Sequence, residues 1–272
     1  MSVAAYYNEI DPYAAAWLRN LIAAGHLAAG DVDTRSIEDV TPDDIQGYNQ
    51  CHFFAGIGVW SHALRRAGWP DSKPVWTGSC PCQPFSAAGK GAGFADERHL
   101  WPAWHYLIEE CRPPIVFGEQ VASKDGLGWL DLVQSDMEAS GYAIGPVDLC
   151  AAGVGAPHIR QRLWFAGERL ANADDARLQG PKRGGASGKE GKSVGHAAQR
   201  GGDSPANNHW GGADWLSCRD GKCRPVEPGT FPLAHGAASR VGRLRAYGNA
   251  IVAQAAEEVI AAYMADEASD LI

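Results

Sequence analysis

The chain has 272 residues, enough for one large domain with a small appendage, and a formal net charge of −8 at pH 7. No apolar run approaches the roughly 18 residues that a membrane-spanning helix needs, and the N-terminus lacks a signal-peptide pattern. Seven cysteines, an odd number scattered along the chain, do not suggest a disulfide framework. We therefore expect a cytoplasmic protein with no membrane association.

The charge is distributed unevenly. Residues 1–154 carry a net charge of −10, residues 155–245 carry +7, and residues 246–272 carry −5. A basic segment inside an acidic protein predicts one surface that meets a polyanion. A solvated basic loop would have the same composition.

The first part of the chain predicts short strands and helices. Residues 3–9 form a strand, and residues 12–24 form a helix that begins with a proline and ends before Gly25. A second strand ends near Asp31, and residues 41–46 form a capped turn or short helix.

The middle of the chain continues this alternation. Strands are expected at residues 51–54, 74–80, 114–121, 142–150 and 160–170, with helices at 55–68, 97–111 and 126–141. Such alternation predicts an α/β fold with a mainly parallel sheet.

The last hundred residues differ in composition. Residues 174–214 are rich in glycine, alanine, serine and basic residues, which predicts a flexible insertion. Residues 213–229 are typical of a hairpin that turns at Asp220 and Gly221, and residues 251–268 of a final helix.

Two motifs follow predicted strands. In FAGIG, residues 54–58, the glycines let a ligand approach the backbone beside a helix N-terminus, although tight packing would also use glycines. In CPCQPFS, Cys82 is a candidate nucleophile, although most cysteines are small buried thiols. The spacings of Cys80 and of the Cys218–Cys223 pair fit zinc poorly, so no metal is expected.

Polar residues at two further strand ends are candidates for the same crevice. Glu119 ends a buried-looking strand and would lie beside Cys82, where a carboxyl can bind a base edge or donate a proton. Arg160 and Arg162 alternate along a strand and therefore share a face. A surface acid and an exposed basic strand are the simpler alternatives.

Taken together, F-A-G-I-G, P-C-Q-P-F-S, Glu-x-Val, H-x-R-x-R and Y-G-N-A-I-V resemble the DNA (cytosine-5) methyltransferases of bacterial or phage type. The resemblance covers nearly the whole chain except residues 174–214. It implies the S-adenosylmethionine-dependent methyltransferase fold, a Rossmann-like, mainly parallel sheet with helices on both faces. The implied domains are a catalytic and cofactor-binding domain (1–167), a short target-recognition region (168–240) and a returning C-terminal helix (241–272).

The resemblance also implies an activity. A monomeric enzyme would transfer a methyl group from S-adenosyl-L-methionine to a flipped-out cytosine of double-stranded DNA, releasing S-adenosyl-L-homocysteine, as in restriction-modification. Cys82 would attack carbon 6, Glu119 would bond the ring nitrogen and amino group, Arg162 would hold the base and Arg160 would support the loop. The cofactor would contact Phe54, Gly56, Ile57, Gly58, Glu9, Ile10, Asp31 and Asn249, and the base would also meet Gln83, Ser86 and Val121. The loop from Ser86 to Phe94 would close as a lid.

The motif order departs from the family. The acidic stretch that begins at Glu9, and the Gly30–Asp31 pair, would usually lie between FAGIG and PCQPFS, but here they precede FAGIG. We infer the order second, third, first, fourth strand, which predicts that Glu9 lies close to Gly56. An acid that merely caps a surface helix is the alternative.

Two residues and one region also depart from the family pattern. Gln120 stands where the family has Asn, His158 stands where it has Gln, and the recognition region is short. An RNA (tRNA) cytosine-5 methyltransferase and a catalytically silent DNA-binding relative are the competing hypotheses.

Overall fold

The computed structural model describes residues 5–81, 100–156, 158–170, 214–217, 223–226 and 249–269. The chain divides into two compact units, one formed by Met1–Arg169 with Thr230–Ile272 and the other by Leu170–Gly229. Cys82, Gln83, Ser86 and the predicted lid lie outside the described residues, as does most of the predicted insertion.

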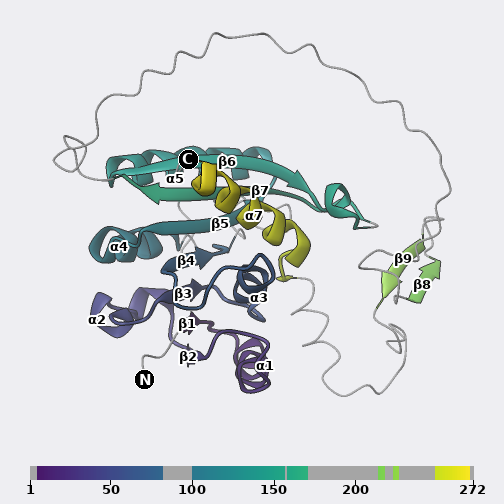
Figure 1. The fold of residues 1–272 in the computed structure, drawn as a ribbon, viewed down its shortest axis with the longest axis horizontal. Coiled ribbons are helices and arrows are strands. Elements are labelled where there is room, and N and C mark those ends of the chain that lie inside the picture. The colour runs from purple at the N-terminus through teal and green to yellow at the C-terminus, as the bar shows by residue number, and fades with distance from the viewer. Residues whose placement is uncertain are drawn as a thin grey trace, which may run out of the picture. The chain divides into compact units, whose positions relative to one another are not determined.

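The first unit alternates strands and helices in the predicted way (Figure 1). Its strands are β1 (Ala5–Asn8), β2 (Gly30–Asp33), β3 (Gln50–Phe53), β4 (Val75–Gly78), β5 (Ile115–Val121), β6 (Tyr142–Cys150) and β7 (Gln161–Arg169). Its helices are α1 (Pro12–Ala23), η1 (Ile37–Asp39), α2 (Pro42–Ile45), α3 (Val59–Arg66), α4 (Trp101–Cys111), α5 (Lys124–Ala139), η4 (Ala151–Val154) and α7 (Ala253–Ser269).

These seven strands form one sheet in the order β2-β1-β3-β4-β5-β7-β6. The pairs from β2 across to β5 are all parallel, whereas β7 runs antiparallel to both β5 and β6. The carboxyl ends of β1 to β5 therefore share one edge of the sheet with the amino end of β7. Ligands of open α/β sheets bind at such an edge.

Helices cover both faces of the sheet. Helices α1, α3 and α7 cover one face. The buried side chains between these helices and the sheet include Tyr7, Trp60, Phe117 and Ile260. On the other face, Phe53, Val116 and Phe165 pack beneath η1, α2, α4 and α5, where six buried tryptophans and tyrosines fill the core. These buried residues on that face are Tyr6, Trp76, Trp101, Trp104, Trp129 and Tyr142. The predicted α/β class with helices on both faces is confirmed.

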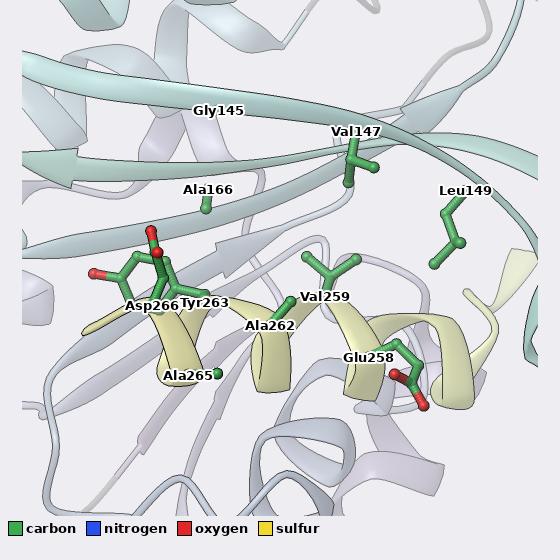
Figure 2. A pocket seen from close by; sticks show the side chains of 10 residues that line it. All are labelled: Gly145, Val147, Leu149, Ala166, Glu258, Val259, Ala262, Tyr263, Ala265 and Asp266. Atoms are coloured by element: carbon green, nitrogen blue, oxygen red, sulfur yellow. The ribbon is translucent and has the colours of Figure 1, made fainter. Parts of the chain in front are cut away.

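A groove runs between α7 and the β6–β7 pair (Figure 2). Val147, Leu149, Val259 and Ala262 make its floor and walls largely apolar. None of the residues that line it belongs to the predicted site.

The described part of the second unit contains one strand pair. β8 (Asp214–Ser217) and β9 (Cys223–Val226) are antiparallel, as the hairpin prediction requires. The predicted turn at Asp220 and Gly221 lies outside the described residues.

Several details differ from the sequence predictions, and the 3-10 helix η1 is one that was not predicted. β2 does not end near Asp31 but continues to Asp33, because its last residue pairs with Asn8 of the neighbouring strand. The short 3-10 helix η4 was not predicted, since its four residues, AAGV, carry no capping signal. No helix among the described residues is both long and apolar enough to cross a membrane.

Candidate active site

Glu9 joins two strands that are far apart in the sequence. It directly follows β1, and its Oε2 accepts a hydrogen bond from the backbone N–H of Gly56 at 2.7 Å. Its Oε1 accepts from the N–H of Asp11 at 2.8 Å, and the Asp11 carboxylate in turn caps α1. The predicted proximity of Glu9 and Gly56 is confirmed, whereas contact between Glu9 and a ribose stays a prediction.

The FAGIG loop has an unusual backbone. Phe54, Gly56 and Gly58 have φ angles of 52°, 57° and 80°, in the left-handed region that glycine adopts freely. A Cβ on Gly58 would lie 2.4 Å from Leu27 Cδ1, so that glycine serves packing. A Cβ on Gly56 would meet nothing within 4 Å, so the backbone there faces open space. Gly56 therefore fits the ligand hypothesis, and Gly58 fits the packing alternative.

Ile10 lies at the same edge and is 64% exposed. An exposed branched apolar side chain next to a carboxylate offers a flat ring a surface to pack on. Ile57 is half-buried in the neighbouring loop, where the chain turns into α3.

Asp31 lies away from the end of its strand. It pairs with Tyr6 in the second position of β2, and its carboxylate accepts a hydrogen bond from the Tyr48 hydroxyl at 2.8 Å. The acidic residue that lies at the edge is instead Asp33, whose backbone carbonyl accepts a hydrogen bond from the N–H of Glu9. Sequence reasoning missed Asp33 because it ended the strand two residues too early.

Asp33 is held by its own neighbours. Its carboxylate accepts hydrogen bonds from the Tyr6 hydroxyl at 2.7 Å and from Arg35. Burial alone would raise the pKa of Asp33, but the hydrogen bonds from Arg35 and Tyr6 outweigh it and lower the pKa. Asp33 is therefore a carboxylate at neutral pH.

The buried Glu119 and the partly exposed Arg162 form an ion pair at the edge. Arg162 Nε lies 2.7 Å from Glu119 Oε1, and Glu119 is only 6% exposed. The register explains the contact, because Glu119 pairs with Trp164 and Arg162 pairs with Val121 on the same face of the antiparallel strands. The structure thus brings together two residues that sequence reasoning assigned separately to one crevice.

Burial dominates the electrostatics of this pair. Desolvation raises the pKa of Glu119, while the charge of Arg162, a hydrogen bond from Ser79 and the charge of Arg160 oppose the rise. A carboxyl with a raised pKa can carry a proton nearer to neutral pH than an exposed glutamate. Glu119 is therefore suited to hydrogen-bond a ligand either as an acceptor or as a donor.

Arg160 connects the start of β7 to the C-terminal segment. Its guanidinium donates a hydrogen bond to the carbonyl of Ala250 at 2.9 Å, across 90 residues of sequence. Burial and the charge of Arg162 lower the pKa of Arg160. Asn249, next to Ala250, is exposed. The contact supports a positioning role for Arg160.

The two residues that depart from the family motifs lie beside this site. Gln120 is buried, and its Oε1 accepts from the N–H of Val121 at 2.9 Å. Burial and the charge of Arg160 lower the pKa of His158, so this histidine is neutral at physiological pH. Among the described residues, no three His, Cys, Asp or Glu side chains are arranged to hold a metal ion.

Part of the chain, including residues of the candidate site, is similar to a known protein family. Residues 70–183 match the family model for C-5 cytosine-specific DNA methylase, a range that includes Cys82, Glu119 and both arginines of the motif. Residues 70–183 are therefore similar to the C-5 cytosine-specific DNA methylases. This match confirms the predicted resemblance over residues 70–183, and it begins after the FAGIG loop.

Individual curated methylases match different shares of the chain. Type II methyltransferase M.HhaI of Haemophilus parahaemolyticus is 35% identical over 31% of this chain and 27% of its own length. Type II methyltransferase M.PspPI of Psychrobacter sp. (strain TA137) is 29% identical over 53% of this chain and 45% of its own. The chain thus spans less than half the length of these curated relatives.

Solved structures of similar proteins include a Spodoptera frugiperda DNMT2 mutant and a putative DNA modification methyltransferase encoded within an E. coli prophage. The first has a TM-score of 0.39 and 17% identity over 60% of this chain and 42% of that chain. The second has a TM-score of 0.40 and 19% identity over 62% of this chain and 42% of that chain.

Proposed function

We propose that this protein is an S-adenosylmethionine-dependent DNA (cytosine-5) methyltransferase. The observation that carries the proposal is the ion pair between the buried Glu119 and Arg162 at the sheet edge, inside the segment that matches the methylase family. A carboxyl and a guanidinium side by side offer complementary hydrogen bonds to the polar edge of a flipped cytosine.

The cofactor site is proposed at the ends of β1 and β3. The residues there fit S-adenosylmethionine, because Glu9 supplies a carboxylate for ribose hydroxyls, Ile10 an apolar surface for adenine, and Gly56 an open backbone. Phe54, Ile57 and Gly58 complete the loop, and Asp31 and Asn249 remain predicted contacts. When bound, S-adenosylmethionine supplies an activated methyl group.

The protein's own residues prepare the base. The Cys82 thiolate forms a bond to carbon 6, and the displaced electron pair makes carbon 5 nucleophilic. Glu119 bonds the ring nitrogen and the amino group and stabilises the charge that develops there, while Arg162 orients both the base and the carboxyl. After methylation, loss of the carbon-5 proton expels the cysteine. Gln83, Ser86 and Val121 are proposed to line the base.

We infer that the cofactor half has a rearranged order. Only 22 residues separate Gly58 from Pro81, too few for two strand–helix units, and the family match begins only at residue 70. A linear family model can align only the part of a rearranged chain that keeps the usual order. The hydrogen bond between Glu9 and Gly56 supports the same inference.

The finer assignments are part of this proposal. Double-stranded DNA is the partner, the region within residues 168–240 reads the target sequence, and the enzyme acts as a monomer within restriction-modification. A thiolate mechanism needs reduced Cys82, which fits the cytoplasm.

Transfer of a labelled methyl group tests the activity. The purified protein is incubated with labelled S-adenosylmethionine and either duplex plasmid DNA or tRNA, and acid-stable label is counted. We expect label in DNA and none in tRNA. Label in tRNA alone would establish the RNA hypothesis instead. A covalent adduct with DNA containing 5-fluorocytosine, formed by the wild type and not by Cys82→Ala, would exclude a silent relative.

A further inference from the structure

The ends of β4 and β5 place Ser79 beside Glu119. Gly78 and Gly118 are partners in the sheet register, so the residues that follow them emerge next to each other at the edge. A Cβ on Gly78 would meet Trp104, and one on Gly118 would meet Phe165, on the face covered by α4 and α5. Ser79 and Glu119 therefore point to the opposite face, which α3 covers.

A tryptophan of α3 meets Ser79 there. The indole Nε1 of Trp60, which is 3% exposed, donates a hydrogen bond to Ser79 Oγ at 3.1 Å. An indole N–H can only donate, so the hydroxyl oxygen must act as the acceptor in this contact. The hydroxyl hydrogen of Ser79 is then available to the carboxyl with which it hydrogen-bonds, that of Glu119.

We propose that Ser79 is a positioning residue for Glu119, and that Trp60 fixes the direction of its hydroxyl hydrogen bond. The inference rests on the proposed function, since it assigns to Ser79 the task of orienting the carboxyl that binds the cytosine. Three groups then hold Glu119: Arg162 as an ion pair, Arg160 by its charge, and Ser79 as a neutral donor.

A neutral hydrogen-bond donor affects the Glu119 carboxyl differently from a second cation. It fixes the orientation of the carboxyl without adding the positive charge that would strongly favour ionisation in a buried site. Glu119 can then keep a raised pKa and still be held from two sides. In the sequence, Ser79 lies three residues before the proposed nucleophile, Cys82.

Carboxyl NMR titration of the ligand-free protein tests the proposal. With carbon-13-labelled glutamate, the signal of Glu119 is assigned by its loss in Glu119→Gln, and its titration is followed in wild type, Ser79→Ala and Ser79→Thr. Loss of a donor to the carboxylate raises its pKa, so Ser79→Ala should move the titration to higher pH. Ser79→Thr, which keeps the hydroxyl, should restore the wild-type curve.

A matched variant tests the direction of the hydrogen bond. Trp60→Phe removes the indole donor but leaves the serine hydroxyl able to donate, so its titration shift should be smaller than that of Ser79→Ala. The Trp60 indole N–H signal, assigned from the same variant, should move in Ser79→Ala and return in Ser79→Thr. An unchanged Glu119 titration in a folded Ser79→Ala variant would overturn the proposal, as would an unchanged indole signal.

Kinetics connect the contact to the reaction. In Ser79→Ala we expect kcat for methyl transfer to fall about tenfold, with KM for DNA within about twofold, because the loss is in orientation rather than binding. An unchanged kcat would refute the positioning role even if the titration shifts. A wild type that shows the hydrogen bond by NMR but methylates no nucleic acid would instead refute the proposed function.

Discussion

The two halves of the sheet edge hold their acids in different ways. In the first half, formed by β1 to β3, Glu9 is partly exposed and accepts hydrogen bonds from backbone N–H groups. In the second half, formed by β4, β5 and β7, Glu119 is buried and held by the side chains of Arg162 and Ser79. The first arrangement suits an acid that accepts hydrogen bonds from backbone N–H groups and from hydroxyls. The second suits an acid whose protonation state is adjustable.

The halves also differ in how they depend on chain order. The second half lies inside the family match and keeps the order of the motifs, whereas the first half lies outside it. Sheet pairing needs only that each strand reaches its neighbour, so Gly56 and Glu9 can meet across 46 residues. Residues from distant parts of the chain therefore form one edge. Mutations should affect the two halves of that edge separately.

The largest effect should come from the second half. Cys82→Ala and Glu119→Gln should each lower methyl transfer by at least about 10³-fold, because they remove the nucleophile and the group that stabilises charge on the ring. Binding of S-adenosylhomocysteine, measured by calorimetry, should change by less than about threefold. Glu109→Gln, at an exposed acid on α4, is the control that should keep full activity.

Arg162→Ala should lower kcat by about 10²-fold, because the variant leaves Glu119 buried without its ionic partner. Arg162→Lys should recover part of the loss, since an ammonium replaces the charge but not the geometry of the guanidinium. Single-turnover methyl transfer measures both variants. Equal rates for Arg162→Lys and Arg162→Ala would mean that charge plays no part at this position.

Glu9→Ala tests the first half of the edge. Removing its carboxylate should weaken S-adenosylhomocysteine binding about tenfold to a hundredfold, because it removes charged hydrogen-bond acceptors worth about 1.5–3 kcal/mol. The carboxyl titration of Glu119 should stay as in the wild type. Glu38→Ala, at an exposed acid of η1, should leave binding unchanged. If Glu9→Ala bound the ligand normally, the cofactor assignment of the first half would fail.

The smallest effect concerns the pH dependence of stability. The folded pKa of Glu119 is raised, so its contribution favours folding below the unfolded value of about 4.3 and is lost as pH rises through the folded pKa. Glu119→Gln cannot lose a proton, so its stability relative to wild type should increase as pH rises through this range. Urea unfolding at several pH values measures the difference. A constant difference would mean that the pKa of Glu119 is not raised.

Much of the fold could be predicted because its signals are local. The capped start of α1 at Asp11 and Pro12, and the apolar run of β5, depend on neighbouring residues alone. The proximity of Glu9 and Gly56 was predictable only through the family motifs. The position of Asp33 at the end of β2, and the contact of Ser79 with Glu119, depend on strand register. Neither composition nor periodicity specifies that register.

Bisulfite sequencing of the plasmid that expresses the protein tests the central claim most directly, because it reports activity, chemistry and target together. Plasmid from cells that express the wild type should contain cytosines that resist conversion within one defined sequence context, and plasmid from Cys82→Ala cells should contain none of these. Complete conversion in the wild-type plasmid, with the protein shown to be folded and abundant, would contradict the assignment as a DNA cytosine-5 methyltransferase.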